Sequence, residues 1–131
     1  MKHPTISAVV EPRGASRLSL SFFNESEEDA YLYRPNACLE GRFDNDVLVV
    51  LDAGERVPYI GCYTKRPAPQ PDDFFAIAPQ SSFRVDVDVA LAYKVAPQGR
   101  YTVLYQAFHD NPFNENDLWE VTSNTVAIAF E

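Results

Sequence analysis

Large apolar residues occupy nearly every second position from Phe83 to Leu91, and this run constrains the fold more than any other feature of the sequence. A two-residue period places alternate side chains on opposite faces of a β-strand. Similar alternation occurs in Val57–Tyr63 and Tyr101–Tyr105, and turn-forming residues separate the three runs. Residues 57–105 therefore predict a half-buried antiparallel sheet, and the expected fold class is all-β.

Shorter patterned runs predict further strands before and after this stretch. These strands are expected at Ile6–Glu11, Arg17–Phe23, Ala30–Arg34, Val47–Leu51 and Thr125–Phe130. The first is expected as an edge strand or an ordered arm, and the last is expected to pair inside the fold. Leu18, Leu20 and Phe22 share one face of the second strand, whereas the unbroken apolar run at 47–51 is typical of a strand buried on both faces.

The connections carry turn chemistry of several kinds. Asp52–Glu55 is expected to be a hairpin turn, because Gly54 suits a backbone with positive φ. Ala37–Glu40 is expected to continue a sheet edge irregularly. Asn114–Asp117 can form a single helical turn with Asn114 as its N-cap.

Length, composition and charge exclude several classes of protein. A chain of 131 residues suffices for one hydrophobic core, so 1–131 is expected to be a single domain, with 1–16 as an edge strand or arm. A hydrophobic content of 46% argues against disorder. The net charge of −8 argues against binding a nucleic-acid backbone and suits a basic protein partner, or solubility alone.

The first residues lack the apolar run of a secretory signal, and no stretch is long and apolar enough to span a membrane. The sequence as written is therefore expected to be cytoplasmic, without membrane contact. A start that replaces a removed signal would look the same, and the protein would then be exported. Cys38 and Cys62 are expected as free thiols in the first case and as one disulfide in the second.

An ordered set of motifs resembles a known accessory domain. The set runs P-Y-I-G-C-Y-T-K-R, D-D-F, an A-P turn, V-D-V-A-L-A-Y and G-R-Y-T-V, preceded by S-L-S-F-F-N-E-S-E-E-D-A-Y-L-Y-R-P-N-A-C-L. Over roughly Leu18 to Asp110 it resembles the β-sandwich domain that precedes the zinc protease domain of peptidyl-Lys, deuterolysin-like metallopeptidases. The resemblance implies an immunoglobulin-like β-sandwich of about 7–9 strands.

The chain also departs from that family. The helical H-E-x-x-H zinc motif of the protease is missing, so the resemblance covers only the accessory domain. Gln80 follows Ala78 and Pro79 where a glycine is expected, which favours a type I turn over a type II turn with positive φ. Tyr93 and Tyr101 flank a connection in a layout similar to the tyrosine corner of immunoglobulin-like sandwiches, in which a tyrosine hydroxyl bonds the backbone.

Residues that could support catalysis are few. The sequence has no zinc-ligand spacing, no nucleophile elbow and no phosphate-binding glycine loop, and its histidines are His3 and His109. A pair of Cys62 with His109 is the least favoured hypothesis, because buried structural cysteines are commoner. Asp86 and Asp88 are expected side by side on a solvated sheet face. No catalytic residue, cofactor or metal site is predicted.

Two segments are candidates for binding a partner. The first is the aromatic and acidic connection after residue 107, whose candidate residues are Asp110, Phe113, Glu115, Asp117 and Trp119. Aromatic anchors with a charged rim are typical of protein interfaces. The alternative is that Trp119 folds back onto the core while the acids are solvated.

The second segment is Thr64–Asp73, in which alternating prolines predict a stiff, extended backbone. Its candidate contact residues are Lys65, Arg66, Asp72 and Asp73. The alternative is a simple crossover between sheets.

The expected function is that of a non-catalytic protein-binding module, a stand-alone relative of the metallopeptidase accessory domain. The alternative is an acidic inhibitor or immunity protein that blocks a basic enzyme or toxin, since opposite charge speeds association. The partner is expected to be another protein. The sequence does not fix the oligomeric state.

Overall fold

The computed structural model describes residues 6–61, 71–96, 99–111 and 114–129. Two hairpin-linked strands open the chain, β1 (Ile6–Gly14) and β2 (Arg17–Asn24), and β7 (Ser82–Asp88) pairs with the other edge of β2. All pairs in this three-stranded sheet are antiparallel. The apolar positions of β2 and the alternation of β7 are what specify these strands, as the sequence predicts.

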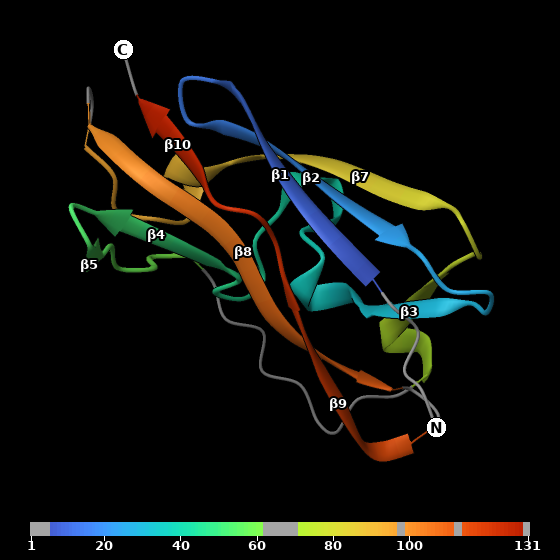
Figure 1. The fold of residues 1–131 in the computed structure, drawn as a ribbon. Coiled ribbons are helices and arrows are strands. Elements are labelled where there is room, and N and C mark those ends of the chain that lie inside the picture. The colour runs from blue at the N-terminus through green and yellow to red at the C-terminus, as the bar shows by residue number, and fades with distance from the viewer. Residues whose placement is uncertain (1–5, 62–70, 97–98, 112–113, 130–131) are drawn as a thin grey trace.

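A second antiparallel sheet is built around β8 (Arg100–Asn111), the long strand that crosses Figure 1. Its order is β10-β8-β4-β5, with β4 (Leu48–Asp52), β5 (Glu55–Arg56) and β10 (Val126–Ala129). The far half of β8 pairs with β9 (Asn114–Thr122). One long strand therefore connects the body of this sheet to a projecting hairpin.

The remaining elements are short. Strands β3 (Ala30–Tyr33) and β6 (Phe74–Ile77) form a two-stranded antiparallel sheet. The 3-10 turns are η1 (Arg34–Asn36), η2 (Leu39–Gly41), η3 (Pro71–Asp73) and η4 (Val89–Leu91). The described residues thus form an all-β, antiparallel structure, which confirms the predicted fold class.

One hydrophobic cluster lies between the two larger sheets. Strand β2 contributes Leu18, Leu20 and Phe22, the face that the sequence predicts, and each is almost fully buried. Phe22 meets Tyr105 of β8 edge to face, with ring centroids 5.1 Å apart. Burying each such side chain stabilises the fold by about 1.5–3 kcal/mol, so this contact between sheets is a main source of stability.

Strand β1 lies alongside the segment that joins β9 to β10 (Figure 1). Ala8 and Ser123 form a parallel bridge, and the Asn124 side chain bonds both backbone groups of Val10. These contacts join the two sheets along one side. Strand β10 lies at the edge of its sheet and pairs with β8 alone among the described strands. The expectation that the last strand pairs inside the fold, between two neighbours, is therefore wrong.

Two strand predictions need correction. In β4, Leu48 and Val50 are buried, but Val49 and Leu51 are only half-buried, so the strand is not buried on both faces. The strand predicted at 57–63 does not form over its described part, residues 57–61, where Tyr59 makes a single bridge to Tyr93. The rings of Tyr59 and Tyr93 pack 5.2 Å apart, and this contact holds the segment in an irregular path.

The predicted irregular edge at 37–40 is also wrong. Residues 39–41 form η2, and both Cys38 (φ 53°) and Glu40 (φ 60°) adopt left-handed backbone conformations. Nothing in the sequence signals this, because such residues rarely adopt positive φ.

The strand predicted at Phe83–Leu91 ends early. Asp88 accepts a hydrogen bond from the Ala90 amide at 3.0 Å and caps η4, which turns the chain out of the sheet. Leu91, the last residue of the alternating run, is 71% exposed.

Gln80 has a φ of 59°, so the expected type I turn is wrong. The Ser81 amide bonds the Ala78 carbonyl at 3.1 Å across a turn with positive φ at its third position, as in type II. The Gln80 side-chain amide donates to the Glu25 carbonyl at 3.1 Å, and its backbone amide donates to the Asn24 carbonyl at 3.0 Å. These bonds offset the backbone strain at a non-glycine residue.

The tyrosine corner is confirmed as a hydrogen bond, because the Tyr101 hydroxyl accepts from the Ala96 amide at 2.7 Å. The Tyr93 hydroxyl makes a second link, accepting from the Leu48 amide at 2.9 Å and donating to Asp46 at 2.7 Å. The helical turn predicted at 114–117 is wrong, since those residues lie in β9. Pairing with β8 overrides the local capping preference of Asn114.

Candidate binding surface

The outward side of β8 is the feature from which a binding surface can be built. Tyr101, Val103 and Tyr105 point into the core, so the even-numbered residues face away from it. These are Thr102, Leu104, Gln106 and Phe108. Phe108 is 54% exposed, and Leu104 is half-buried, although both are large and apolar.

The neighbouring strands extend this surface in register. Leu51 of β4 and Ala127 of β10 lie on either side of Thr102, and Val49 of β4 lies beside Leu104. Because paired residues share a face of the sheet, these side chains form one surface. We call it the outer face and define it as Val49, Leu51, Thr102, Leu104, Gln106, Phe108, Ala127 and Ala129.

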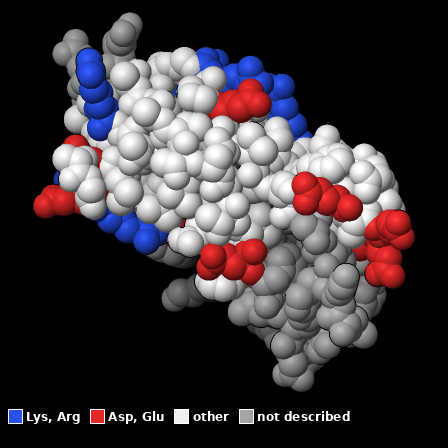
Figure 2. Space-filling view, viewed as in Figure 1, with Lys and Arg blue, Asp and Glu red and all other residues white. Residues whose placement is uncertain are grey.

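All eight members of the outer face are uncharged residues. In Figure 2 the side of the molecule on which β8 and β10 lie in front is mostly uncharged, and the charged side chains lie toward its margins. Glu120 of β9 pairs with Phe108 and so places a carboxylate beside the exposed ring. It accepts a hydrogen bond from Thr122 at 2.9 Å. An apolar patch with a polar rim is the composition of a protein interface.

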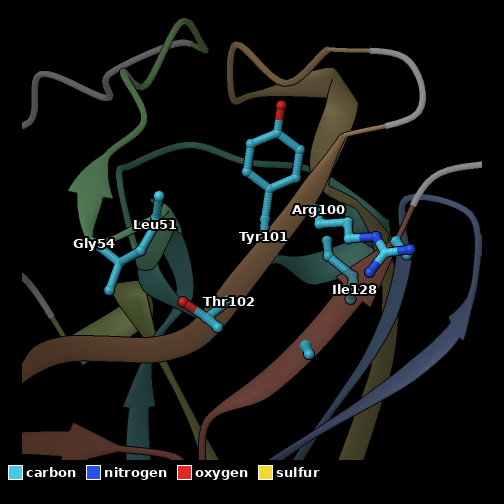
Figure 3. A pocket seen from close by; sticks show the side chains of 9 residues that line it. Leu51, Gly54, Arg100, Tyr101, Thr102 and Ile128 are labelled. Carbon is cyan, nitrogen blue, oxygen red and sulfur yellow. The ribbon is translucent and has the colours of Figure 1, made fainter.

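A groove lies at the end of the outer face opposite Phe108. It has a volume of about 350 Å³ and is lined by Leu51, Ala53, Gly54, the segment Arg100–Thr102 and the segment Ala127–Ala129. Figure 3 shows Leu51 and Gly54 on one side, Arg100 and Ile128 on the other, and Thr102 between them. Small residues at 127 and 129 leave this space open. Arg100 contributes the one charged side chain of the described lining.

A buried hydrogen-bond network fixes the hairpin end of the outer face. His109 is fully buried; its Nδ1 accepts from the Tyr33 amide at 2.9 Å, and its Nε2 lies 2.9 Å from the Tyr105 hydroxyl. That hydroxyl donates to the Asn36 carbonyl at 2.6 Å, so His109 must donate from Nε2. The ring is therefore neutral and joins β8 to β3 and η1.

Burial without a charged partner lowers the pKa of His109 to about 4. Burial also raises the pKa of Tyr105 well above its usual value. Both ring nitrogens of His109 are used by the protein, so neither is free to activate a cysteine thiol in this arrangement. Cys62, its hypothetical partner, lies outside the described residues.

The residues predicted to bind a partner fall into two groups. Lys65, Arg66 and Phe113 lie outside the described residues, as do the side chains of Asp110, Glu115, Asp117 and Trp119. The backbone of those four residues lies in the β8–β9 hairpin. Asp72 and Asp73 lie in η3, where Asp72 is exposed and Asp73 is half-buried.

The structure brings the described ends of the two predicted segments to one place, the turn η1. Arg34 donates from Nε to the Asp72 carbonyl at 3.2 Å, and Asn36 donates from Nδ2 to the Phe108 carbonyl at 2.9 Å. Both segments thus start from the same end of the molecule, next to Phe108.

Asp86 and Asp88 differ in environment despite their spacing. Asp86 is exposed and lies 3.4 Å from Arg84 as an ion pair, in line with the predicted solvated face. Asp88 is half-buried, bonds the Ser16 hydroxyl at 2.5 Å and caps η4. The part of the chain that the structure describes contains no group of three or more potential metal ligands.

Cys38 is a free, buried thiol. Burial, assisted by the nearby Asp44 carboxylate, raises its pKa to about 12. The disulfide considered for Cys38 and Cys62 is therefore not formed in this structure.

Reasoning from the sequence missed the outer face. Its signal was present in β8, where Leu104 and Phe108 are apolar residues at positions that alternation assigns to solvent. A strand with apolar residues on both faces is either covered on both faces or carries an exposed surface, and here it carries an exposed surface.

No protein-family model matches the chain, and no curated protein matches it. The resemblance to a metallopeptidase accessory domain therefore rests on the sequence motifs. Among the described residues no helix has the length and apolar character required to traverse a lipid bilayer.

Proposed function

We propose that this chain is a non-catalytic, protein-binding immunoglobulin-like β-sandwich that contacts its partner through the outer face. The observation that carries this proposal is the apolar pair of half-buried Leu104 and exposed Phe108 on the outward side of one strand. Strands hold side chains more rigidly than loops do, so little ordering entropy is lost when a partner docks. The proposal keeps the relation to a metallopeptidase accessory domain as the source of the module.

The β8–β9 hairpin, which contains the backbone of the residues predicted from the sequence, continues the strand that carries Phe108. Asp110 follows Phe108 by two positions along β8, and Glu115, Asp117 and Trp119 lie on the partner strand. A partner that covers Phe108 would meet the hairpin next. Phe108 would then act as a central anchor, with Glu120 as part of its rim.

The second candidate is an acidic inhibitor or immunity protein for a basic enzyme or toxin. The carboxylate of Glu120 beside Phe108 and the net charge of −8 favour it. Electrostatic steering would give it an association rate that falls steeply as salt is raised. A salt-independent association rate would favour the first candidate.

The proposed surface can be tested by affinity capture from extract of the source cells. Phe108→Ser and Leu104→Lys should each weaken capture of the specific partner at least tenfold. The first removes an apolar ring from the centre of the patch, and the second places there a charge that is costly to desolvate. Leu91→Ser is the matched control, since Leu91 is 71% exposed against 54% for Phe108 and lies on η4.

Folding of each variant is checked by its urea midpoint. If Phe108→Ser and Leu104→Lys capture the partner as well as Leu91→Ser does, the outer face is not the interface. The double variant Phe113→Ala and Trp119→Ala separates the contribution of the hairpin from that of the sheet. Identifying the product of the adjacent reading frame, a toxin or a zinc protease, separates the two candidate functions.

A further inference from the structure

The groove at the end of the outer face is lined by both an apolar row and a cation. Leu51, Thr102 and Ala127 form a row across three strands, because Leu51 pairs with Thr102 and Thr102 pairs with Ala127. Arg100 lies two residues before Thr102 on the same side of β8, at a spacing of roughly 6.5–7 Å. The apolar row and the cation therefore line the same groove.

The guanidinium of Arg100 is available to a ligand. Among the described residues it makes no hydrogen bond or ion pair with its side chain, whereas Arg56 pairs with Asp46 at 3.5 Å and Arg42 with Asp44 at 3.6 Å. Figure 3 shows the Arg100 side chain on the β10 side of the groove, away from Leu51. A ligand lying across β8 would meet Leu51 at one end and Arg100 at the other.

We propose that this groove binds the C-terminal residue of a partner polypeptide, with its carboxylate on Arg100 and an aliphatic side chain against Leu51 and Ala127. This inference rests on the proposed protein-binding function and adds the kind of segment that is recognised. Arginine donates two parallel hydrogen bonds to a carboxylate, which fixes the direction of the bound chain.

The chemistry favours a chain terminus over an acidic side chain. A C-terminal aliphatic residue carries both a carboxylate and an apolar branch, and the groove is lined by a cation and by apolar residues. Aspartate and glutamate side chains carry a carboxylate without an apolar branch. The volume of about 350 Å³ is at the low end of the roughly 300–1,000 Å³ found for ligand pockets, as suits one terminal residue.

The test uses three probes and the full chain: acetyl-Ala-Leu with a free carboxylate, the same dipeptide with a C-terminal amide, and hexanoate. Binding is followed by NMR shifts of the backbone amides of Gly54, Thr102, Ala127 and Ala129. The free-acid dipeptide should bind at least tenfold more tightly than the amide. Arg100→Gln should reduce that preference to less than twofold, whereas Arg17→Gln, an exposed arginine at the start of β2, should leave it unchanged.

A second variant separates the wall from the cation. Ala127→Leu fills the groove and should weaken both dipeptides without removing the preference for the acid. Equal binding of acid and amide, absence of binding by every probe, or an acid preference that survives Arg100→Gln would overturn the proposal. Tighter binding of hexanoate than of the dipeptide acid would assign the groove to free aliphatic acids and would also overturn it.

Failure here is distinguishable from failure of the proposed function, because the probe titration involves no partner protein. If Phe108→Ser loses capture but no probe binds, only the groove is wrongly assigned. If the dipeptide acid binds through Arg100 but capture is unaffected by Phe108→Ser and Leu104→Lys, only the outer face is wrongly assigned.

Discussion

The side-chain amide of Asn124 bonds both the backbone amide and the carbonyl of Val10, as the backbone of a residue in a neighbouring strand does. The Val10 amide donates to Asn124 Oδ1 at 2.8 Å, and Asn124 Nδ2 donates to the Val10 carbonyl at 3.1 Å, although 114 positions separate the two residues. Both backbone hydrogen-bonding groups of Val10 in β1 are thereby satisfied by a residue of the segment between β9 and β10. This link closes the side of the fold where the two sheets meet.

Asn124→Asp should destabilise the protein by about 1–3 kcal/mol, because the carboxylate can accept from the Val10 amide but faces the Val10 carbonyl without a donor. Urea unfolding at pH 7 measures this loss. Asn124→Ala should cost less than Asn124→Asp, since it leaves no charge against the carbonyl. A smaller loss for aspartate than for alanine would contradict the paired geometry.

His109 should make stability depend on pH. Its pKa is about 4 in the folded protein, against 6.5 for an exposed histidine. Above pH 6.5 the imidazole is therefore neutral in both the folded and the unfolded protein. As the pH drops from 6.5 toward 4, His109 becomes protonated in the unfolded chain but stays neutral in the folded protein. Stability is therefore lost over that range, by about 3 kcal/mol in total from this residue.

The control for this prediction is His109→Asn, which does not titrate. The difference in unfolding free energy between the wild type and the variant should change by about 3 kcal/mol from pH 7 to pH 4, with carboxylate effects cancelling. A constant difference would show that His109 is not buried as a neutral ring. NMR of the ring should in addition report the Nε2–H tautomer.

Tyr105→Phe tests the same network from its other end. Loss of the hydroxyl leaves the Asn36 carbonyl and the Nε2–H of His109 without their partners, which are 2.6 and 2.9 Å away. The expected cost is about 1–3 kcal/mol in chemical unfolding. Tyr101→Phe, which releases the Ala96 amide from its 2.7 Å bond at a less buried position, should cost less. The reverse order would contradict the greater burial of Tyr105.

Cys38 should be chemically silent in the folded state. Its pKa of about 12 against 9 for an exposed thiol leaves about a thousandfold less thiolate at pH 8. In a Cys62→Ser background, a thiol reagent should therefore modify Cys38 about a thousandfold more slowly in buffer than in denaturant. The intact mass of the wild type should not change on reduction. A two-proton loss without reductant would instead indicate a bridge to Cys62.

The β4–β5 turn offers a stabilising substitution. Ala53 has a φ of 50° and precedes Gly54 at 88°, the two positive values of a type I′ turn. An alanine in this conformation is strained, whereas asparagine tolerates it. Ala53→Asn should raise the unfolding free energy by about 0.5–1 kcal/mol, and Ala53→Val should lower it. Loss of stability in both variants would contradict the turn type.

Local patterns predicted some of these elements and failed at others for identifiable reasons. The alternation from Phe83 to Asp88 and the corner at Tyr101 were readable, because a strand period and a turn leave marks in adjacent residues. The positive φ of Gln80 was not, since it depends on bonds to Glu25 and Asn24 more than fifty positions away. Pairing between distant strands likewise turned Asn114–Asp117 into β9.

The candidate site divides in the same way. The sequence singled out Trp119 and Asp110 in a segment assumed to be a loop, and the structure shows their backbone in a hairpin that continues β8. The outer face was missed because alternation places Leu104 on the side of β8 away from Tyr105 but does not show whether another element covers that side. Arg100 becomes part of a groove because β10 pairs with β8, and no local sequence pattern specifies that pairing.

Hydroxyl-radical footprinting of the protein with and without its captured partner tests the central claim most directly. Leu104 and Phe108 should lose most of their reactivity in the complex, because the outer face is covered there. Leu91 and Ile60, which are 71% and 60% exposed, should react as they do in the free protein. Protection of Leu91 and Ile60 with unchanged reactivity at Leu104 and Phe108 would contradict the assignment of the outer face as the binding surface.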